Sequence, residues 1–262
     1  MTLIVGILCS DGVVIASDGA ATLGSPGSPT VRQEVKKLDI ISDKIVVGVS
    51  GPVGLGQKMK ETIANQYNSK VFSSKTPLEV SSLISDGMRT HIVPLFQTAK
   101  VTAPVVGNGM AGTNVMSSSV VAMIIQRKPA LFQFAYDAAS EQATEDIPFI
   151  AVGSGQGLAD PFLAFLRRIF WKDHLPTLNE GIFAALWAVE QAIIVNPGGV
   201  SKPIQVAVLT EEDGGVAREL DATELEEHYQ SIQAAENKLS TYKTEIIEET
   251  IAQDIPTPVE EE

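Results

Sequence analysis

The sequence predicts an α+β fold, built as a four-layer sandwich in which two β-sheets carry helix pairs on their outer faces. Strands, two helices, strands, two helices and strands follow one another along the chain, instead of alternating one by one. No domain linker is evident before residue 221, and a chain of 262 residues can bury a large core. We therefore expect one domain over residues 1–220, followed by an acidic helical extension over residues 221–262.

The first elements are two strand pairs. The β-branched runs TLIVGILC and GVVIASDG flank a Ser-Asp-Gly turn, which predicts a hairpin whose first strand begins at Thr2. The runs KKLDII and KIVVGVSG flank the turn SDK and predict the second pair. A strand at the very start of a chain is unusual, because terminal residues fray unless they are held in place.

Two helices follow Gly51-Pro52. In the second of them, Thr76 is the predicted N-cap, Pro77 takes the first helical position and Glu79 completes a capping box. Apolar residues at helical spacing predict the buried faces. These residues are Leu55, Met59 and Ile63 in the first helix, and Leu78, Ile84, Met88 and Ile92 in the second.

The second half of the domain repeats this order. SVVAMIIQ, LFQFAYD and PFIAVGSG are predicted strands. One helix is expected to open at Asp160-Pro161, and another at Thr177, where Glu180 completes a capping box, running to about Val195. PIQVAVL and VAREL, on either side of EEDGG, predict a closing hairpin.

The extension is predicted to be one long helix from Ala222 to about Ala252, followed by a disordered segment, QDIPTPVEEE. Its apolar residues recur every seven positions, with only partial filling between them. Packing against the body of its own or a neighbouring subunit and a free coiled coil both remain open. The residues of this stripe are Leu225, Ile232, Leu239 and Ile246.

The charge distribution argues against polyanionic partners. Residues after Thr210 hold 16 of the 32 acidic side chains and only 3 of the 19 basic ones, so the rest of the chain is neutral. We expect neither a nucleic acid nor a membrane as partner. A single cysteine, Cys9, the absence of a signal-peptide pattern and the absence of an uninterrupted apolar run of about 18 residues favour a cytoplasmic protein.

Neither a cofactor nor a metal is expected. GNGMAG at 107–112 fits a dinucleotide-loop pattern, but a strand rather than a helix is predicted after it. GPVGLGQK at 51–58 resembles a phosphate loop but has glutamine where the lysine belongs. The three histidines, His91, His174 and His228, have no metal-ligand spacing.

Thr2 is the most informative position. Removal of Met1 before a small residue would expose the threonine, whose α-amine, with a pKa of about 8, can act as a base near neutral pH. One residue then carries both the nucleophile and its base, and no histidine is needed. This chemistry requires that Thr2 be held rigidly, because both its hydroxyl and its α-amine take part.

The runs TLIVGILCSDGVVIASDGAATLG, VKKLDII, KIVVGVSG, IAVGSGQG and PIQVAVL together resemble β-type proteasome subunits over about residues 2–220. The similarity is greatest to the bacterial members, the heat-shock peptidase HslV and the betaproteobacterial proteasome homologues. The resemblance implies an N-terminal nucleophile hydrolase fold. It also implies that Thr2 is the nucleophile, Lys37 the catalytic lysine and Asp18 the carboxylate that holds this lysine.

Further roles follow from the same resemblance. Gly48 is matched to the backbone oxyanion donor, Thr22 to the position that pairs with an extended substrate, and Ser154 to a serine near the threonine amine. The family has an aspartate and a turn serine after its last body helix. Here Asn196 lies where the aspartate is expected, and Ser201 is the candidate for the serine. An amide is not a charged acceptor, so this departure bears on the strength of catalysis.

The resemblance implies a self-compartmentalising threonine endopeptidase that degrades unfolded polypeptides. It also implies self-association into two stacked hexameric or heptameric rings, twelve or fourteen subunits with fourteen favoured, and an ATP-dependent unfoldase as a candidate partner. Two alternatives remain open: an N-terminal nucleophile amidase acting on small amides, and a catalytically weak assembly with a binding or scaffold role.

Overall fold

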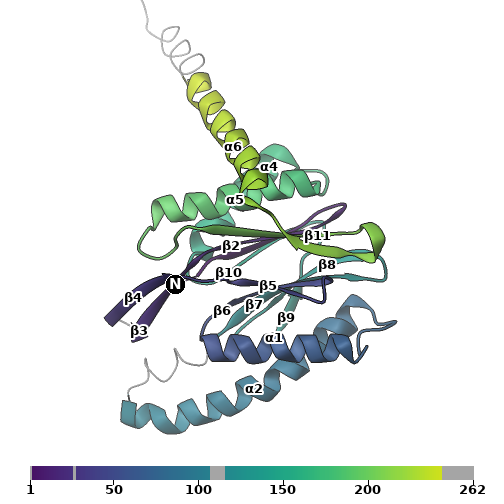
Figure 1. Cartoon of the computed structure of the whole chain (residues 1–262), viewed down its shortest axis with the longest axis vertical. Helices are drawn as coiled ribbons and strands as arrows, with labels where there is room; N and C mark the ends of the chain where they lie inside the picture. Colours follow the sequence, from purple (N-terminus) through teal and green to yellow (C-terminus); the bar gives the residue numbers. More distant parts are fainter. Residues whose placement is uncertain (1, 26–27, 107–115, 244–262) are drawn as a thin grey trace, which may run out of the picture. The chain divides into compact units, whose positions relative to one another are not determined.

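The computed structural model describes residues 2–25, 28–106 and 116–243 of the chain (Figure 1). The chain divides into two compact units, Met1–Leu220 and Asp221–Glu262. In the described part of the chain, the first unit holds two five-stranded sheets, one two-stranded sheet and four α-helices. The motif at 107–112 and the chain beyond Lys243, including Ile246, lie outside the described residues.

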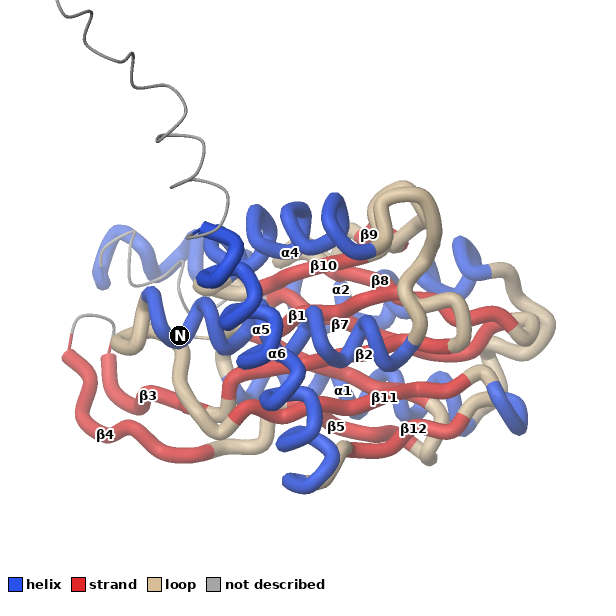
Figure 2. The backbone as a smooth tube through the Cα atoms, turned by 90° about the horizontal axis from the view of Figure 1, so that it is seen from above, coloured by secondary structure: helices blue, strands red, loops and turns tan. Residues whose placement is uncertain are grey.

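The first unit is a stack of helices, sheet, sheet and helices (Figures 1 and 2). Each sheet has five antiparallel strands. In spatial order the first sheet contains β10 (Phe149–Val152), β1 (Ile4–Leu8), β2 (Gly12–Asp18), β11 (Ile204–Thr210) and β12 (Val216–Glu219). The second contains β5 (Leu38–Ile41), β6 (Ile45–Ser50), β7 (Ser118–Ile125), β8 (Lys128–Phe134) and β9 (Ser140–Gln142).

Helices cover the outer face of each sheet. α1 (Val53–Asn68) and α2 (Pro77–Val106) lie on the second sheet, and α4 (Gln156–Phe170) and α5 (Leu178–Val195) lie on the first. The sheets face each other through apolar side chains such as Ile4, Ile15 and Val120, all fully buried. The predicted four-layer α+β sandwich is therefore confirmed.

Most predicted elements occur where the sequence places them. Leu55, Met59 and Ile63 are buried on α1. The Thr177 side chain accepts a hydrogen bond from the Glu180 N–H, and the Glu180 side chain accepts one from the Thr177 N–H, so the capping box of α5 is present. Thr76 and Glu79 make the equivalent contacts ahead of α2.

Three predictions about element boundaries and faces were wrong. β1 begins at Ile4 rather than Thr2. α4 begins at Gln156, and Pro161 is its sixth residue, where the proline removes the N–H that would otherwise bond to the Gly157 carbonyl. Leu78 is 74% exposed on α2, and Val80 takes the buried position instead.

A hairpin of β3 (Ala20–Ser25) and β4 (Ser28–Glu34) was not predicted. It forms a separate two-stranded sheet, in which β3 pairs with β4 along one edge. The Gly- and Pro-rich composition of the segment hides the strand signal. Through this hairpin the chain runs from Asp18 to Lys37, so the hairpin joins the two sheets next to both residues.

α5 is long and apolar enough, by length and composition alone, to cross a membrane, and it is the one such helix in the described part of the chain. Half of its residues are buried inside the protein. Its apolar side chains contact β1, β2 and β11 on one side and α4 on the other. The helix is therefore a core helix of the first unit, and its composition reflects burial on more than one face.

The second unit contains α6 (Ala222–Tyr242). Asp221 is its N-cap and accepts hydrogen bonds from the backbone N–H groups of Thr223 and Glu224, while the Glu224 side chain completes a capping box. The predicted helix start is confirmed. The predicted end near Ala252 and the disordered tail lie outside the described residues.

Candidate active site

Thr2 lies just ahead of β1 and is held through its backbone. The Gly155 N–H donates a hydrogen bond to the Thr2 carbonyl oxygen at 3.2 Å. The following residue, Leu3, donates from its N–H to Asp18 Oδ1 at 2.9 Å and accepts at its carbonyl from the Asp18 N–H at 3.2 Å. These contacts hold the backbone of Thr2 in place, although Thr2 lies ahead of β1 and is not part of the strand.

Lys37 connects Thr2 with Asp18. Its Nζ lies 3.2 Å from Thr2 Oγ1 and 2.6 Å from Asp18 Oδ1. The side chain of Lys37 is 6% exposed and that of Asp18 is fully buried. A buried ammonium within hydrogen-bond distance of a hydroxyl stabilises negative charge that develops on that oxygen.

Asp18 has further donors besides Lys37. The Leu3 N–H shares Oδ1 with Lys37, and the N–H groups of Ala20 and Ser201 each approach Oδ2 at 3.4 Å. Asp18 ends β2 at the centre of the first sheet, between β1 and β11. A buried carboxylate is tolerated where an opposite charge and several N–H groups compensate for its lost hydration.

Ser154 faces the other side of Thr2. The Thr2 N–H donates to Ser154 Oγ at 3.1 Å, and Ser154 Oγ donates to the Thr2 carbonyl oxygen at 3.4 Å. While Met1 is attached, the Thr2 nitrogen is an amide. Once Thr2 is the first residue, the same atom is an amine with Ser154 Oγ beside it.

Gly153 is required by its backbone. Its φ is +97°, which L side chains rarely adopt, and a Cβ added there would clash with the Thr2 carbonyl oxygen. Gly153→Ala is therefore expected to lower the free energy of unfolding by about 1–3 kcal/mol through strain alone, measured by urea denaturation. It should also displace Thr2 and slow reaction of its hydroxyl with a β-lactone. Gly157→Ala is the matched control, because Gly157 on α4 has open space around its Cα; an equal loss in both variants would contradict this expectation.

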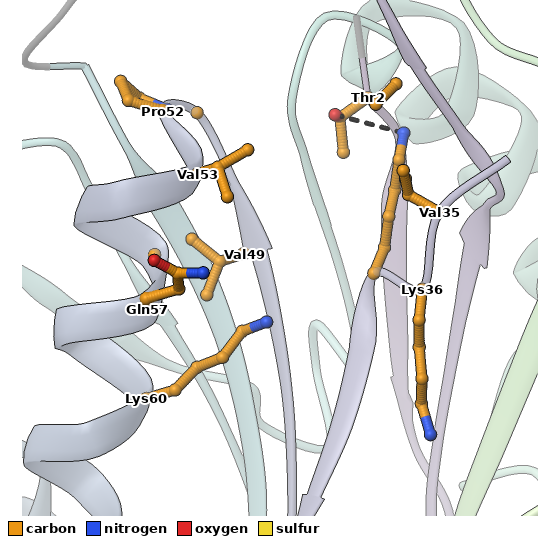
Figure 3. A pocket seen from close by; sticks show the side chains of 12 residues that line it. Thr2, Val35, Lys36, Val49, Pro52, Val53, Gln57 and Lys60 are labelled. Carbon is orange, nitrogen blue, oxygen red and sulfur yellow. Dashed lines mark hydrogen bonds between the residues drawn. The ribbon is translucent and has the colours of Figure 1, made fainter. Parts of the chain in front are cut away.

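A pocket of about 410 Å³ opens beside Thr2. Figure 3 shows Thr2, Val35 and Lys36 on one wall and, facing them, Val49 of β6 with Val53, Gln57 and Lys60 of α1. Three lysines and no carboxylate line it. The complete lining is Thr2, Ala21, Val35, Lys36, Lys37, Val49, Gly51, Pro52, Val53, Gly56, Gln57 and Lys60.

Two of these lysines make ion pairs with residues outside the lining. Lys60 contacts Asp39 of β5, and Lys36 contacts Glu219 of β12. The Lys60 side chain is 25% exposed, whereas that of Lys36 is 59% exposed. The charge of Lys60 is therefore more shielded from water than that of Lys36. Because water screens exposed charges, Lys36 contributes less to the electrostatic attraction of a ligand in the pocket.

Gly48 and Thr22 are placed on strands near the site. Gly48 lies within β6, opposite Leu38 and Val120, and a Cβ on it would approach Ile4 to 2.9 Å, so close sheet packing explains the glycine. The β6 residues that line the pocket include Val49 but not Gly48. The backbone of Thr22 lies on β3, opposite Arg32 of β4.

Ser201 contacts the site through its backbone, and Asn196 lies ahead of it at the end of α5. Ser201 reaches Asp18 through its backbone N–H, and its hydroxyl donates to the Lys202 carbonyl at 3.3 Å. Asn196 is the C-cap of α5, and its carbonyl accepts hydrogen bonds from Gly199 and Val200. Asn196 thus shapes the turn that leads to Ser201. The structure brings Thr2, Asp18, Lys37 and Ser154 together, with the Ser201 backbone beside them.

Sequence reasoning missed Gln205 of β11. Its side chain accepts from the Lys37 N–H at 2.9 Å and donates to the Val35 carbonyl at 2.6 Å. The signal for it is slight, a single glutamine in the apolar run PIQVAVL. Within the described ranges no group of three or more His, Cys, Asp or Glu side chains is arranged to hold a metal ion.

The family model described as "Proteasome subunit" matches residues 2–193. This chain belongs to the proteasome subunit family. The β-type proteasome-like resemblance and the N-terminal nucleophile hydrolase fold predicted from the sequence are thereby confirmed. The matched range includes Thr2, Asp18, Lys37 and Ser154 and ends before Asn196.

Curated proteasome subunits of archaea are among the similar proteins. Proteasome subunit beta 1 of Thermococcus gammatolerans is 31% identical over 194 residues, which cover 73% of this chain and 81% of the relative. Proteasome subunit beta of Methanococcus maripaludis strain C7 is 38% identical over 88 residues, 32% of this chain. In that alignment this chain spans only 39% of the length of the relative.

Among solved structures, the Anbu complex of Pseudomonas aeruginosa, described as a helical assembly, has a TM-score of 0.62 to this chain at 18% identity. The superposition covers 98% of both chains. At this identity the likeness concerns the fold alone. This proteasome-family chain thus shares its fold with Anbu over nearly its whole length.

Proposed function

We propose that this protein is a threonine endopeptidase in which Thr2, freed of all preceding residues, is the nucleophile. The observation that carries the proposal is the position of the buried Lys37 Nζ, 3.2 Å from Thr2 Oγ1 and 2.6 Å from Asp18 Oδ1. Membership of the proteasome subunit family supports the same chemistry. The nucleophile, its base and the stabilising ammonium are all supplied by the chain itself.

The first half of the reaction forms an acyl-enzyme. The α-amine of Thr2 takes the hydroxyl proton, directly or through a water, and Oγ1 attacks the scissile carbonyl carbon. The Lys37 ammonium stabilises the developing charge on Oγ1, and Asp18 keeps the ammonium in place. The C–N bond then breaks, and the proton passes from the Thr2 amine to the leaving amine of the substrate.

The second half regenerates the enzyme. A water attacks the ester carbon and the Thr2 amine takes a proton from it. The carboxylic product leaves as the C–O bond to Oγ1 breaks, and the proton passes from the amine to Oγ1. A backbone N–H aimed at the carbonyl oxygen is typically worth about 3 kcal/mol in such reactions, and Gly48 remains the predicted donor. Ser154 Oγ, next to the Thr2 nitrogen, is the proposed proton relay.

An extended substrate is proposed to bind as an added strand. In the described residues, β3, which carries Thr22, pairs only with β4. The backbone groups on the other edge of β3 are proposed to bind the peptide. The pocket beside Thr2 then receives the side chain that precedes the scissile bond. Its walls are largely apolar, and Lys60 contributes a shielded positive charge.

This pocket predicts a preference for glutamate, whose methylene groups suit the apolar walls and whose carboxylate would share Lys60 with Asp39. Lys60→Met is expected to lower the ratio of kcat/KM for a Glu peptide over its Leu counterpart about tenfold, corresponding to about 1.4 kcal/mol. The measurement uses fluorogenic peptides that differ only at this residue. Lys58→Met, on the exposed side of α1, is the control. An unchanged ratio in Lys60→Met would refute the assignment.

We further propose that the protein self-associates and works in the cytoplasm. Stacked rings of twelve or fourteen subunits, with an ATP-dependent unfoldase delivering unfolded chains, agree with the family. Exposed apolar side chains on α4 and α5, among them Phe165, Ile169 and Ile194, offer surface that self-association would cover. Light scattering after size-exclusion chromatography and electron microscopy would give the number of subunits.

Intact mass before and after β-lactone treatment tests the chemistry. The expected result is loss of the mass of Met1, followed by one lactone adduct per chain that peptide mapping places on Thr2. Retention of Met1 without an adduct would overturn the mechanism. Turnover of small amides without peptide cleavage would instead favour the amidase alternative, and absence of both activities would favour the scaffold.

A further inference from the structure

Gln205 lies behind Lys37 on the central part of the first sheet. Its backbone pairs with Ser17 of β2. Its side-chain amide spans two backbone groups of the neighbouring segment, with Oε1 accepting from the Lys37 N–H at 2.9 Å and Nε2 donating to the Val35 carbonyl at 2.6 Å. One side chain therefore holds both ends of a three-residue segment centred on Lys36.

The segment 35–37 needs such a partner because it connects β4 with β5 and belongs to neither strand. The Val35 N–H is bonded to the Gly19 carbonyl at 2.8 Å. The Gln205 side-chain amide bonds to the Val35 carbonyl and the Lys37 N–H. It thus takes the place that the backbone of a neighbouring strand takes in a sheet. Both bonds are partly buried, so losing them would leave backbone groups without compensation.

The position of the Lys37 backbone limits where its ammonium can reach. Nζ lies 2.6 Å from Asp18 Oδ1 but 3.2 Å from Thr2 Oγ1, which is at the long end of the N–H···O range. A shift of the backbone by about 0.5 Å is enough to weaken a contact of this kind. The shorter contact with Asp18 would survive such a shift better than the contact with Thr2.

We propose that Gln205 is a positioning residue for the reaction, which acts on Thr2 by fixing the backbone of Lys37. This inference rests on the proposed function. Gln205 does not itself line the pocket beside Thr2, whereas the three residues of the segment that it holds do, so it acts on the site only through segment 35–37. The proposed role therefore requires a glutamine at position 205 of β11, a strand whose other residues mostly form part of the core.

Gln205→Met tests this role, because methionine keeps the length and volume but makes neither hydrogen bond. We expect kcat per active site to fall by about 10- to 100-fold, because Lys37 Nζ no longer reaches Thr2 Oγ1, with a smaller change in KM from the pocket wall that segment 35–37 forms. Active sites are counted by β-lactone adducts, so a loss of folded protein does not affect kcat. Gln133→Met is the matched control, since Gln133 is a partly exposed glutamine inside β8 that pairs with Val120.

Gln205→Glu gives a readout that a purely structural role would not move. The introduced carboxylate still accepts from the Lys37 N–H but has no proton to donate to the Val35 carbonyl; protonation restores that donor. The ratio of variant to wild-type kcat is therefore expected to rise as the pH is lowered from about 8 to about 5. This variant also serves if Gln205→Met does not fold.

A crystal structure of the variant supplies a readout independent of turnover. We expect the Lys37 Nζ–Thr2 Oγ1 distance to lengthen while the Nζ–Asp18 contact is kept. Wild-type kcat per active site in Gln205→Met, or a flat pH ratio in Gln205→Glu, would overturn the inference and leave the proposed function intact. A wild-type chain that neither cleaves peptides nor reacts with the lactone would overturn the proposed function first, and the role of Gln205 with it.

Discussion

Thr2→Ala is expected to abolish peptide hydrolysis, with a loss of about 10⁴-fold or more, because the variant has no hydroxyl to form the acyl-enzyme. The β-lactone adduct should disappear as well. Only the hydroxyl, with its 3.2 Å contact to Lys37 Nζ, and one methyl group are removed from a half-buried residue that is anchored through its backbone. The free energy of unfolding should therefore change by less than about 1 kcal/mol. Peptide turnover measures the loss of hydrolysis, and urea denaturation measures the free energy of unfolding.

Thr2→Ser is the control for this variant, because it keeps the hydroxyl beside Lys37. It should form the lactone adduct and retain measurable turnover. If Thr2→Ala kept wild-type turnover, the nucleophile would lie elsewhere. Thr2→Ala and Thr2→Ser need the same intact-mass check for Met1, because an unprocessed chain lacks the amine.

Breaking the buried pair of Lys37 and Asp18 is expected to affect stability as well as activity. Lys37→Met leaves the fully buried Asp18 carboxylate without its counter-ion, and removing one partner of such a pair typically costs about 3–5 kcal/mol. The double variant Lys37→Met/Asp18→Asn removes both charges and should recover a large part of that loss. Urea midpoints at a fixed protein concentration give the comparison, and turnover should stay absent in both variants.

Lys36→Met provides the matched control one residue away. Lys36 pairs with Glu219, but the two side chains are 59% and 43% exposed, and exposed pairs contribute about 0–1 kcal/mol. Its stability should stay close to that of the wild type. If Lys36→Met and Lys37→Met lost equal stability, or if Lys37→Met remained active, the buried pair would not have the role assigned to it.

The sequence was sufficient for the layers and for the first members of the site. Short β-branched runs around a turn and Thr-x-x-Glu capping boxes are local signals, and they locate β1, β2, α2 and α5. Thr2, Asp18, Lys37 and Ser154 were found through the family resemblance carried by these runs. The structure adds that all four lie within one chain of hydrogen bonds.

Other features depend on contacts between distant segments and leave no local signal. The bond from Gln205 to Lys37 joins residues 168 positions apart. Gly153 is explained only by the Thr2 carbonyl next to it. Ser201 was chosen for its hydroxyl, yet its backbone N–H is the group that reaches Asp18. The face of α2 was misassigned at Leu78 because a first-turn position can point to solvent while Val80 points inward.

The anchoring of Thr2 has a consequence for how the protein would be switched on. Its carbonyl, its hydroxyl and the adjoining Leu3 are already in place with a peptide bond still on the Thr2 nitrogen. Under the proposed mechanism, removal of Met1 changes this one nitrogen from an amide to an amine, so the unprocessed chain is expected to be folded but inactive. An affinity tag fused ahead of Thr2 would keep the protein in that dormant form, whereas a tag at the other terminus would not.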